Sequence, residues 1–287
     1  MNMDRKKAIL YLAAAAVLWS TGGLFIKLVD WNPMAIAGGR SGIAAIIMLI
    51  YLRRPVKVFE KTKLIGAFTY AAVVILFVVA NKLTTSANAI LLQYTAPIWV
   101  IVFSKFFLKE KSEKRDIVSI IIVMAGMILF FVGDLKSGNL IGNIIAVLSG
   151  VAMAGMVILL KLQKDGSQVE MTLIGNVVTF LIGLPFFFIS TPSLKSAAGL
   201  LALGIFQLGF SYILYGTAVK YVSSVEAIII PVLEPLLNPV WVFLFTGETP
   251  GAFAIIGGVI VVATIIGREI HRQANSLKED EAELKIS

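Results

Sequence analysis

The sequence predicts an all-α membrane protein of ten transmembrane helices, arranged as two inverted five-helix repeats. Three observations predict this fold: an apolar composition, a regular alternation of long apolar stretches with charged clusters, and a repeat relating the two halves. Of the 287 residues, 58% are hydrophobic and 15% are charged, and the mean hydropathy is +0.91. A water-soluble domain of this size cannot carry so apolar a surface, so lipid is the solvent for most of the chain.

Charged and turn-forming clusters divide the chain into stretches of the length that crosses a membrane. A hydrocarbon core about 30 Å thick needs roughly 20 apolar residues per helix. The first stretch follows Asp4-Arg5-Lys6-Lys7. It is too long for a signal-peptide core and lacks a convincing small-residue cleavage site, so we expect it to be retained. The predicted spans are residues 8–28, 33–52, 64–81, 86–108, 117–133, 139–160, 170–190, 197–216, 225–245 and 252–270.

The basic residues lie mostly on one side of this predicted arrangement. With the amino terminus inside, 19 Lys and Arg residues fall in cytoplasmic segments and 4 on the opposite side, leaving Arg40 and Lys105 within spans. By the positive-inside rule both termini are cytoplasmic, in a bacterial or archaeal inner membrane. The net charge of +8 is thus explained by topology, which argues against a nucleic-acid partner. The chain has no cysteine, which excludes disulfides and thiolate metal sites.

The second half of the chain repeats the first. A shift of 138 positions aligns residues 64–129 with 202–267, and a looser match relates 16–18 to 146–148. We therefore expect one repeat over 1–133, a second over 139–271, and a charged cytoplasmic tail over 272–287. Because each unit has an odd number of spans, the second copy enters the membrane from the opposite side, as in many secondary transporters. The alternative is a duplication kept only for folding. Matches that hydrophobicity does not explain are Gly66 with Gly204, Lys82 with Lys220, Ser86 with Ser224, Pro97 with Pro235, and Glu110 with Glu248.

Several spans carry recognisable residue patterns. Residues 17–27 read VLWSTGGLFIK, and Pro33 and Arg40 lie early in the second span. Residues 86–111 end in LKEK, and residues 224–250 contain LEP and, near their end, GE. These patterns resemble the drug/metabolite transporter superfamily, EamA type, over nearly the whole chain. The resemblance implies a permease of five plus five helices, commonly an exporter of amino acids, their relatives or other small metabolites. The shared residues serve mostly packing and turns, so they indicate the family and not the substrate.

Three charged residues remain as candidates once the loops and the outermost residues of the predicted spans are set aside. Charges within a span are expensive and usually face the protein interior or a water-filled cavity. Lys105 is close to the cytoplasmic end of its helix and can extend its ammonium to the interface. Arg40 lies roughly 10 Å below the outer end of its span, and Glu234 lies roughly 13 Å from the inner end of its own. Their depths permit contact if the two helices are neighbours.

The segment around Glu234 combines a carboxyl group with helix-breaking prolines. Prolines recur at 231, 235 and 239, and each frees a backbone carbonyl one turn earlier, a feature of broken helices that form binding or hinge points. Asn238 and Trp241 follow at i+4 and i+7 on the same face. From these surroundings we predict that Glu234 changes its protonation state or binds substrate during the transport cycle. The alternative is a kinked packing helix whose Glu234 is tied to Arg40 and never titrates.

The span over 197–216 carries polar and aromatic residues four positions apart. Gln207, Ser211 and Tyr215, with Tyr212 beside them, are typical of the wall of a wet cavity for an organic solute, or of hydrogen bonding between helices. The two halves differ chemically, because an uncharged residue in one half aligns with a charged residue in the other: Asn176 with Arg40, and Asn88 with Glu226. We interpret Glu226 as a solvated acid at the start of a helix. Further wall candidates are Trp19, Asn88, Gln93 and Tyr94.

The remaining motifs are weak. The only histidine, His271, follows the last span, so no metal site or catalytic triad is expected within the membrane. The pairs Gly38-Gly39 and Gly257-Gly258 indicate close helix packing, and nothing resembles a phosphate-binding loop, so ATP is not expected to drive the protein.

Together these features predict a secondary transporter that carries a small organic metabolite across the lipid bilayer by alternating access. It needs no cofactor, it is not an enzyme, and protons are the candidate coupling ion, with Glu234 the coupling group. Alternatives are a membrane-embedded enzyme, which needs a nucleophile-base or metal cluster at membrane depth, and a passive channel, which needs a continuous polar stripe on several helices. The sequence does not determine which metabolite is the substrate or whether the protein assembles into a homodimer.

Overall fold

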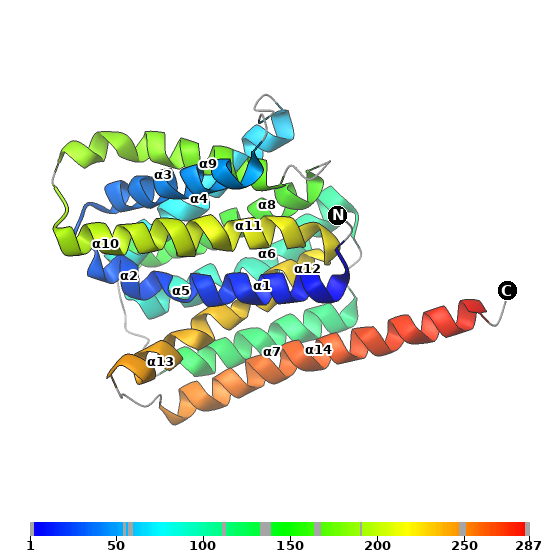
Figure 1. Ribbon diagram of the computed structural model, residues 1–287. Coiled ribbons are helices and arrows are strands. Elements are labelled where there is room, and N and C mark those ends of the chain that lie inside the picture. The colour runs from blue at the N-terminus through cyan, green and yellow to red at the C-terminus, as the bar shows by residue number, and fades with distance from the viewer. Residues whose placement is uncertain are drawn as a thin grey trace.

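The computed structural model describes residues 3–53, 56, 60–110, 113–132, 139–163, 168–189, 191–246 and 251–284, and the regular structure in these ranges is helical. Figure 1 shows a bundle of long helices with both termini at the same end. The elements of the first half are α1 (Arg5–Trp19), α2 (Gly22–Leu28), α3 (Pro33–Leu52), α4 (Lys61–Leu83), α5 (Ser86–Gln93), α6 (Ala96–Phe103), η1 (Ser104–Leu108) and α7 (Lys114–Phe131).

The second half contains the same kind of long helices with more interruptions. Its elements are α8 (Leu140–Leu162), α9 (Gln168–Gly183), η2 (Leu184–Phe188), α10 (Leu194–Ala202), η3 (Leu203–Phe210), α11 (Ser211–Ala218), η4 (Val219–Tyr221), α12 (Ser224–Ile229), η5 (Ile230–Val232), α13 (Leu233–Thr246) and α14 (Ala252–Leu284). Of these, η1 and η3 are π-helical, and η2, η4 and η5 are 3₁₀-helical.

In the described chain, six helical segments are long enough and apolar enough to cross a membrane. They are Pro33–Leu52, Lys61–Leu83, Ala87–Leu108, Leu140–Leu162, Gln168–Phe188 and Leu194–Tyr221, and a shorter apolar helix covers Ala252–Arg268. The prediction of an all-helical membrane protein is confirmed. The count of ten spans remains a prediction, because α1, α7 and α13 are shorter or interrupted.

The break between α1 and α2 follows from the local sequence. Ser20 and Thr21 turn their hydroxyl groups back to the carbonyls of Val17 and Leu18. Such bonds compete with the helix's own hydrogen bonds, and the Gly22-Gly23 pair that follows has low helix propensity. The chain therefore bends beside Trp19, which points into the bundle.

Glycines allow the helices to approach closely. A Cβ atom on Gly38 of α3 would lie 2.9 Å from Gly183 Cα of α9, and one on Gly257 of α14 would lie 2.5 Å from Gly126 O of α7. These distances confirm close packing at two of the predicted glycine pairs. The helix α4 packs against α8 and α9, and α7 lies against α14 at one edge of the bundle (Figure 1).

Candidate functional site

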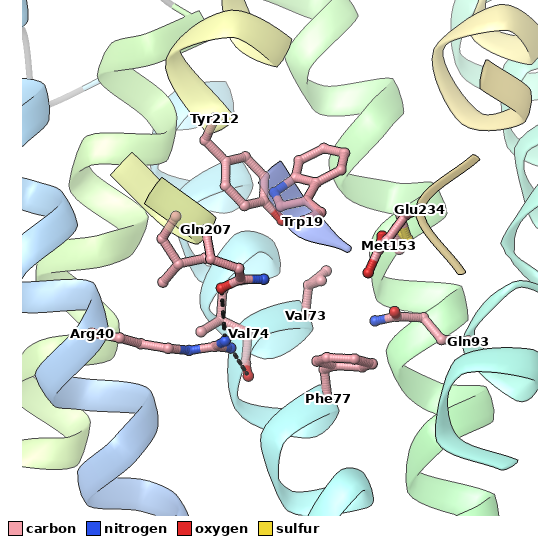
Figure 2. A pocket seen from close by; sticks show the side chains of 11 residues that line it. Trp19, Arg40, Val73, Val74, Phe77, Gln93, Met153, Gln207, Tyr212 and Glu234 are labelled. Carbon is pink, nitrogen blue, oxygen red and sulfur yellow. Dashed lines mark hydrogen bonds between the residues drawn. The ribbon is translucent and has the colours of Figure 1, made fainter. Parts of the chain in front are cut away.

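A small cavity of about 40 Å³ lies between helices of both halves (Figure 2). One water molecule needs roughly 10–15 Å³, so the cavity has room for a few waters and not for a metabolite. In this structure the cavity is therefore too small to hold a substrate. Its walls are Trp19 of α1, Arg40 of α3, Val73, Val74 and Phe77 of α4, Gln93 of α5, Met153 of α8, Gln207 and Leu208 of η3, Tyr212 of α11 and Glu234 of α13.

One wall of the cavity is formed by the guanidinium group of Arg40. This side chain is 1% exposed. Its Nη1 donates to Gln207 Oε1 at 3.0 Å, and its Nη2 donates to the Val74 carbonyl at 3.4 Å. Within the described part of the chain Arg40 has no ion pair with Glu234, so the interpretation of Glu234 as an acid tied to Arg40 is wrong. The two groups occupy opposite sides of the cavity (Figure 2).

The other charged wall is built around the broken helix of Glu234. The Tyr94 hydroxyl lies 2.8 Å from Glu234 Oε2 and 2.9 Å from the Pro231 carbonyl oxygen. Pro235 has no N–H to offer that carbonyl, and Pro231 has none to offer the Ala227 carbonyl. Tyr215 donates its hydroxyl to the Ala227 oxygen at 2.9 Å. The carbonyls of Pro231 and Ala227, which were expected to be unpaired, therefore lie within hydrogen-bonding distance of tyrosine hydroxyls from other helices.

An aromatic cluster, of which Trp19 and Tyr212 line the cavity, lies beside these charges. The Trp19 ring meets Tyr212 edge to face, with centroids 4.9 Å apart, and lies 5.1 Å from Tyr215. Tyr70 also meets Tyr212 edge to face, with centroids 4.8 Å apart, and donates its hydroxyl to Asn176 Oδ1 at 3.2 Å. Edge-to-face contacts of this kind hold rings in defined orientations. The cluster therefore fixes where the Trp19 indole lies at the cavity.

The stripe predicted at Gln207, Ser211 and Tyr215 is only partly at the cavity. Gln207 and Tyr212 line it, whereas Ser211 donates its hydroxyl to the Gln207 carbonyl and Tyr215 packs behind Trp19. All four are buried. The pattern at the cavity differs from the predicted one because residues 203–210 form a π-helix. A π-helix has a wider turn than an α-helix, so Gln207 shares a face with Tyr212, five positions later, and not with Ser211. No signal in the sequence marked this widening of the helix.

The other predicted wall residues have separate positions. Gln93 lines the cavity and donates to Ser149 Oγ at 2.7 Å. Trp241 donates its indole N–H to Ser20 Oγ at 2.8 Å, beside the break between α1 and α2. The Asn238 side chain lies outside the described part of the structure. Lys105 is exposed, in keeping with its expected reach to the interface.

The sequence reasoning missed several wall residues and misjudged one acid. Val73, Val74, Met153 and Leu208 line the cavity, but apolar residues within a span carry no mark that separates cavity walls from lipid-facing surface. Glu226 starts α12, as expected, with its carboxylate accepting from the Ser223 N–H at 2.6 Å. It is however 0% exposed, because Arg5 and Arg268 cover it, so its interpretation as a solvated acid is wrong.

A helical bundle able to cross a membrane several times, with a small cavity lined by charged and aromatic residues inside it, is the architecture of a multi-pass membrane protein and is typical of transporters. The chain belongs to the EamA-like transporter family, whose sequence profile matches residues 6–132 and again residues 140–267. The resemblance read from the sequence motifs is thereby confirmed.

Individual relatives agree with this assignment. An uncharacterized transporter of Clostridium kluyveri is 28% identical, over 96% of this chain and 97% of the relative. A pseudopaline exporter of Pseudomonas aeruginosa is 25% identical over 184 residues, which are 63% of this chain and 64% of the exporter. A known crystal structure matches with a TM-score of 0.78 at 18% identity, over 94% of this chain and 99% of that one, which shows a shared fold.

Proposed function

We propose that this protein is a secondary transporter that exports a small organic metabolite, such as an amino acid or a related compound, by alternating access coupled to protons. The observation that carries the proposal is the bond between Tyr94 and the cavity-lining Glu234, at a helix broken by prolines. The protein acts in the cell membrane of a bacterium or archaeon with ten helices and both termini in the cytoplasm. This orientation is supported by the charge asymmetry and by the termini sharing one end of the bundle (Figure 1).

The direction of two equivalent helices supports an inverted arrangement of the repeats. Lys82, near the end of α4, donates to the Val29 carbonyl, and Ser196, at the start of α10, accepts from the Asp30 N–H. The end of α4 and the start of its repeat equivalent therefore lie at the same end of the bundle. The two segments run in opposite directions, as alternating access by two inverted units requires.

The Tyr94 hydroxyl supports a coupling of protonation to the shape of the broken helix. A tyrosine hydroxyl has one hydrogen, and here it has two acceptors. When Glu234 is ionised, the hydrogen goes to its carboxylate and the Pro231 carbonyl loses it. When Glu234 is protonated, the carboxyl group donates to the Tyr94 oxygen, and the hydroxyl turns to Pro231. Each proton bound or released thus changes a hydrogen bond at the kink between α12 and α13.

Transport of radiolabelled amino acids and metabolites into proteoliposomes, with and without a pH gradient, tests the proposal. We expect saturable exchange by the wild type and accumulation driven by the gradient. Glu234→Gln mimics a permanently protonated acid, so it should keep exchange and lose gradient-driven accumulation. The matched control is Glu113→Gln, at a carboxylate 58% exposed that pairs with Arg115 within the first half, which should behave as wild type.

Two results would contradict the proposal. Wild-type rate and pH dependence in Glu234→Gln would remove this residue from coupling. Uptake that never saturates and shows no exchange would indicate a passive channel.

A further inference from the structure

The break between α1 and α2 is bonded to the helix that carries Glu234. Trp241 lies about two turns after Glu234 in α13, and it donates its indole N–H to Ser20 Oγ at 2.8 Å. Ser20 is 4% exposed and donates its own hydroxyl to the Val17 carbonyl at 2.6 Å. The Ser20 hydroxyl therefore links the last turn of α1 to α13, across 221 positions of the sequence.

The residues that follow Ser20 touch the opposite wall of the cavity. A Cβ atom on Gly22 would lie 2.9 Å from Gln207 Nε2, so the start of α2 lies directly against this amide. The oxygen of the same amide accepts the hydrogen bond from Arg40. Within three positions of the chain, the break thus contacts both the helix of Glu234 and the amide that holds Arg40.

The segments on either side of the break have different neighbours. α1 packs against α11 and α13, whereas α2 packs against α10 and α4, and η3 lies against both. Ser20, Thr21 and the Gly22-Gly23 pair are residue types at which helices kink. Hinges are a few such residues at the ends of helices that absorb changes in backbone angles. The break is therefore placed to act as a hinge between two sets of helices.

The helix α13 also borders an apolar groove of about 640 Å³, which it shares with α14 and the end of α7. Leu236 and Val240 of α13 line the groove, with Val259 and Ile266 of α14 among its other walls. In a bilayer, fluid lipid chains are as apolar as these side chains and can fill such a groove. α13 can therefore tilt toward the groove without displacing a neighbouring helix.

We propose that Trp241 is a positioning residue, whose bond to Ser20 transmits a change at Glu234 to the break between α1 and α2. This inference rests on the proposed transport cycle, and it gives Trp241 a role in conformational coupling instead of substrate binding. When the kink beside Glu234 changes, α13 carries Trp241 with it, and the bond to Ser20 shifts the break as well. α2 then moves against Gln207, so the two walls of the cavity move together.

Labelling of a cysteine in α2 tests this coupling and needs no substrate. The chain has no cysteine, so Ile26→Cys, at a fully buried position of α2, reports how readily this segment opens to a maleimide in detergent. Glu234→Gln mimics the protonated acid and should change the labelling rate of Ile26→Cys at least ~5-fold. In a Trp241→Phe background, which keeps an aromatic ring and loses the N–H, Glu234→Gln should leave that rate unchanged.

A second variant and two matched controls separate the bond from a general loss of packing. Ser20→Ala removes the acceptor, so it should also abolish the effect of Glu234→Gln. Its control is Thr21→Ala, because the Thr21 hydroxyl makes the same kind of bond to a carbonyl of α1, at 2.8 Å, and its described bonds do not reach α13. Trp99→Phe, at a half-buried position of α6, is the control for Trp241→Phe. Both controls should keep the effect of Glu234→Gln.

Two results would overturn the inference. An equal effect of Glu234→Gln on Ile26→Cys in every background would show that the bond to Ser20 transmits nothing. No effect in any background, the wild type included, would show that Glu234 and α2 are not coupled. Because Trp241→Phe and Ser20→Ala remove the bond from opposite sides, either variant decides the question if the other fails to fold.

The labelling result is independent of the transport measurements. Coupled labelling in a protein that carries no compound of the metabolite panel would contradict the proposed function alone. Gradient-driven transport that depends on Glu234, with equal labelling in every background, would contradict the role of Trp241 alone.

Discussion

The two ends of the bundle are held together by different chemistry. At the end that contains both termini, called here the ionic end, four of the described ion pairs join a residue of the first half to one of the second. At the other end, called here the neutral end, the described bonds between the halves join uncharged groups. The ionic pairs are Arg5 with Glu226, Lys63 with Glu170 at 2.7 Å, Asp116 with Arg268 at 2.7 Å, and Glu110 with Lys161 at 3.3 Å. The neutral bonds are Thr84 to Asn143 at 2.8 Å, Asn88 to Asn143 at 3.4 Å, and the Asp30 N–H to Ser196 at 3.0 Å.

Equivalent positions of the two repeats make this difference clear. Asn88 and Glu226 are related by the shift of 138 positions and lie in the first turns of α5 and α12. Asn88 bonds to a neighbouring amide, whereas Glu226 bonds to Arg5 and lies 3.6 Å from Arg268. Inverted repeats exchange the roles of their ends between the two transport states. On the proposed alternating-access cycle, ion pairs that join the two halves at the ionic end favour the state in which this end is closed.

The largest effect is expected from Glu226→Gln at the ionic end. Loss of the carboxylate removes the negative group that Arg5 and Arg268 share, while Arg268 keeps its pair with Asp116. The expected cost is about 3 kcal/mol to the state in which this end is closed. Because the chain has no cysteine, Ala15→Cys in α1 reports on opening of this end through labelling by a membrane-impermeant maleimide. Labelling should accelerate at least ~10-fold.

The buried Ala80 near the neutral end provides the reciprocal reporter for that variant. Ala80→Cys should be labelled more slowly when Glu226→Gln is present. Unchanged labelling at both positions would show that the ion pairs stabilise the fold equally in both states.

A smaller effect is expected when an ion pair is introduced at the neutral end. Asn88→Asp combined with Asn143→Lys places opposite charges where the two amides now meet. The new pair should favour closure of this end by about 1 kcal/mol, so Ala15→Cys should be labelled about 5-fold faster. The single variant Asn88→Asp is the control, and an equal effect of that variant would refute an ion-pair origin.

The smallest effect is expected from an ion pair that does not join the halves. Arg115 pairs with Glu113 within the first half, with side chains 44% and 58% exposed. Arg115→Ala should change stability by less than about 0.5 kcal/mol, because water screens such a pair. Ala15→Cys should keep its wild-type labelling rate. A marked change would mean that charge alone, and not contact between the halves, controls opening.

The site shows where prediction from the sequence succeeded and where it stopped. Glu234, Arg40, Gln207, Gln93, Tyr212 and Trp19 were singled out because polar and aromatic residues are rare within apolar spans, and the structure brings them to one cavity. The hydrogen-bond partners of these residues could not be predicted from the rarity of polar residues in the spans. Arg40 contacts Gln207 and not Glu234, and Tyr94 takes the carbonyl that Pro235 leaves free. These partners lie 137 to 167 positions apart in sequence.

By itself the sequence determined the helical membrane fold, the family and which charged residues lie within apolar segments. These properties depend on composition, on segment length and on residues close together in the chain. Only the tertiary structure decided that η3 widens to bring Tyr212 to the cavity, that Arg5 and Arg268 cover Glu226, and that Arg40 lacks an acidic partner in the described chain. The physical reason is that hydrogen bonds and ion pairs act over a few ångströms. Which groups come within that distance depends on how the helices pack.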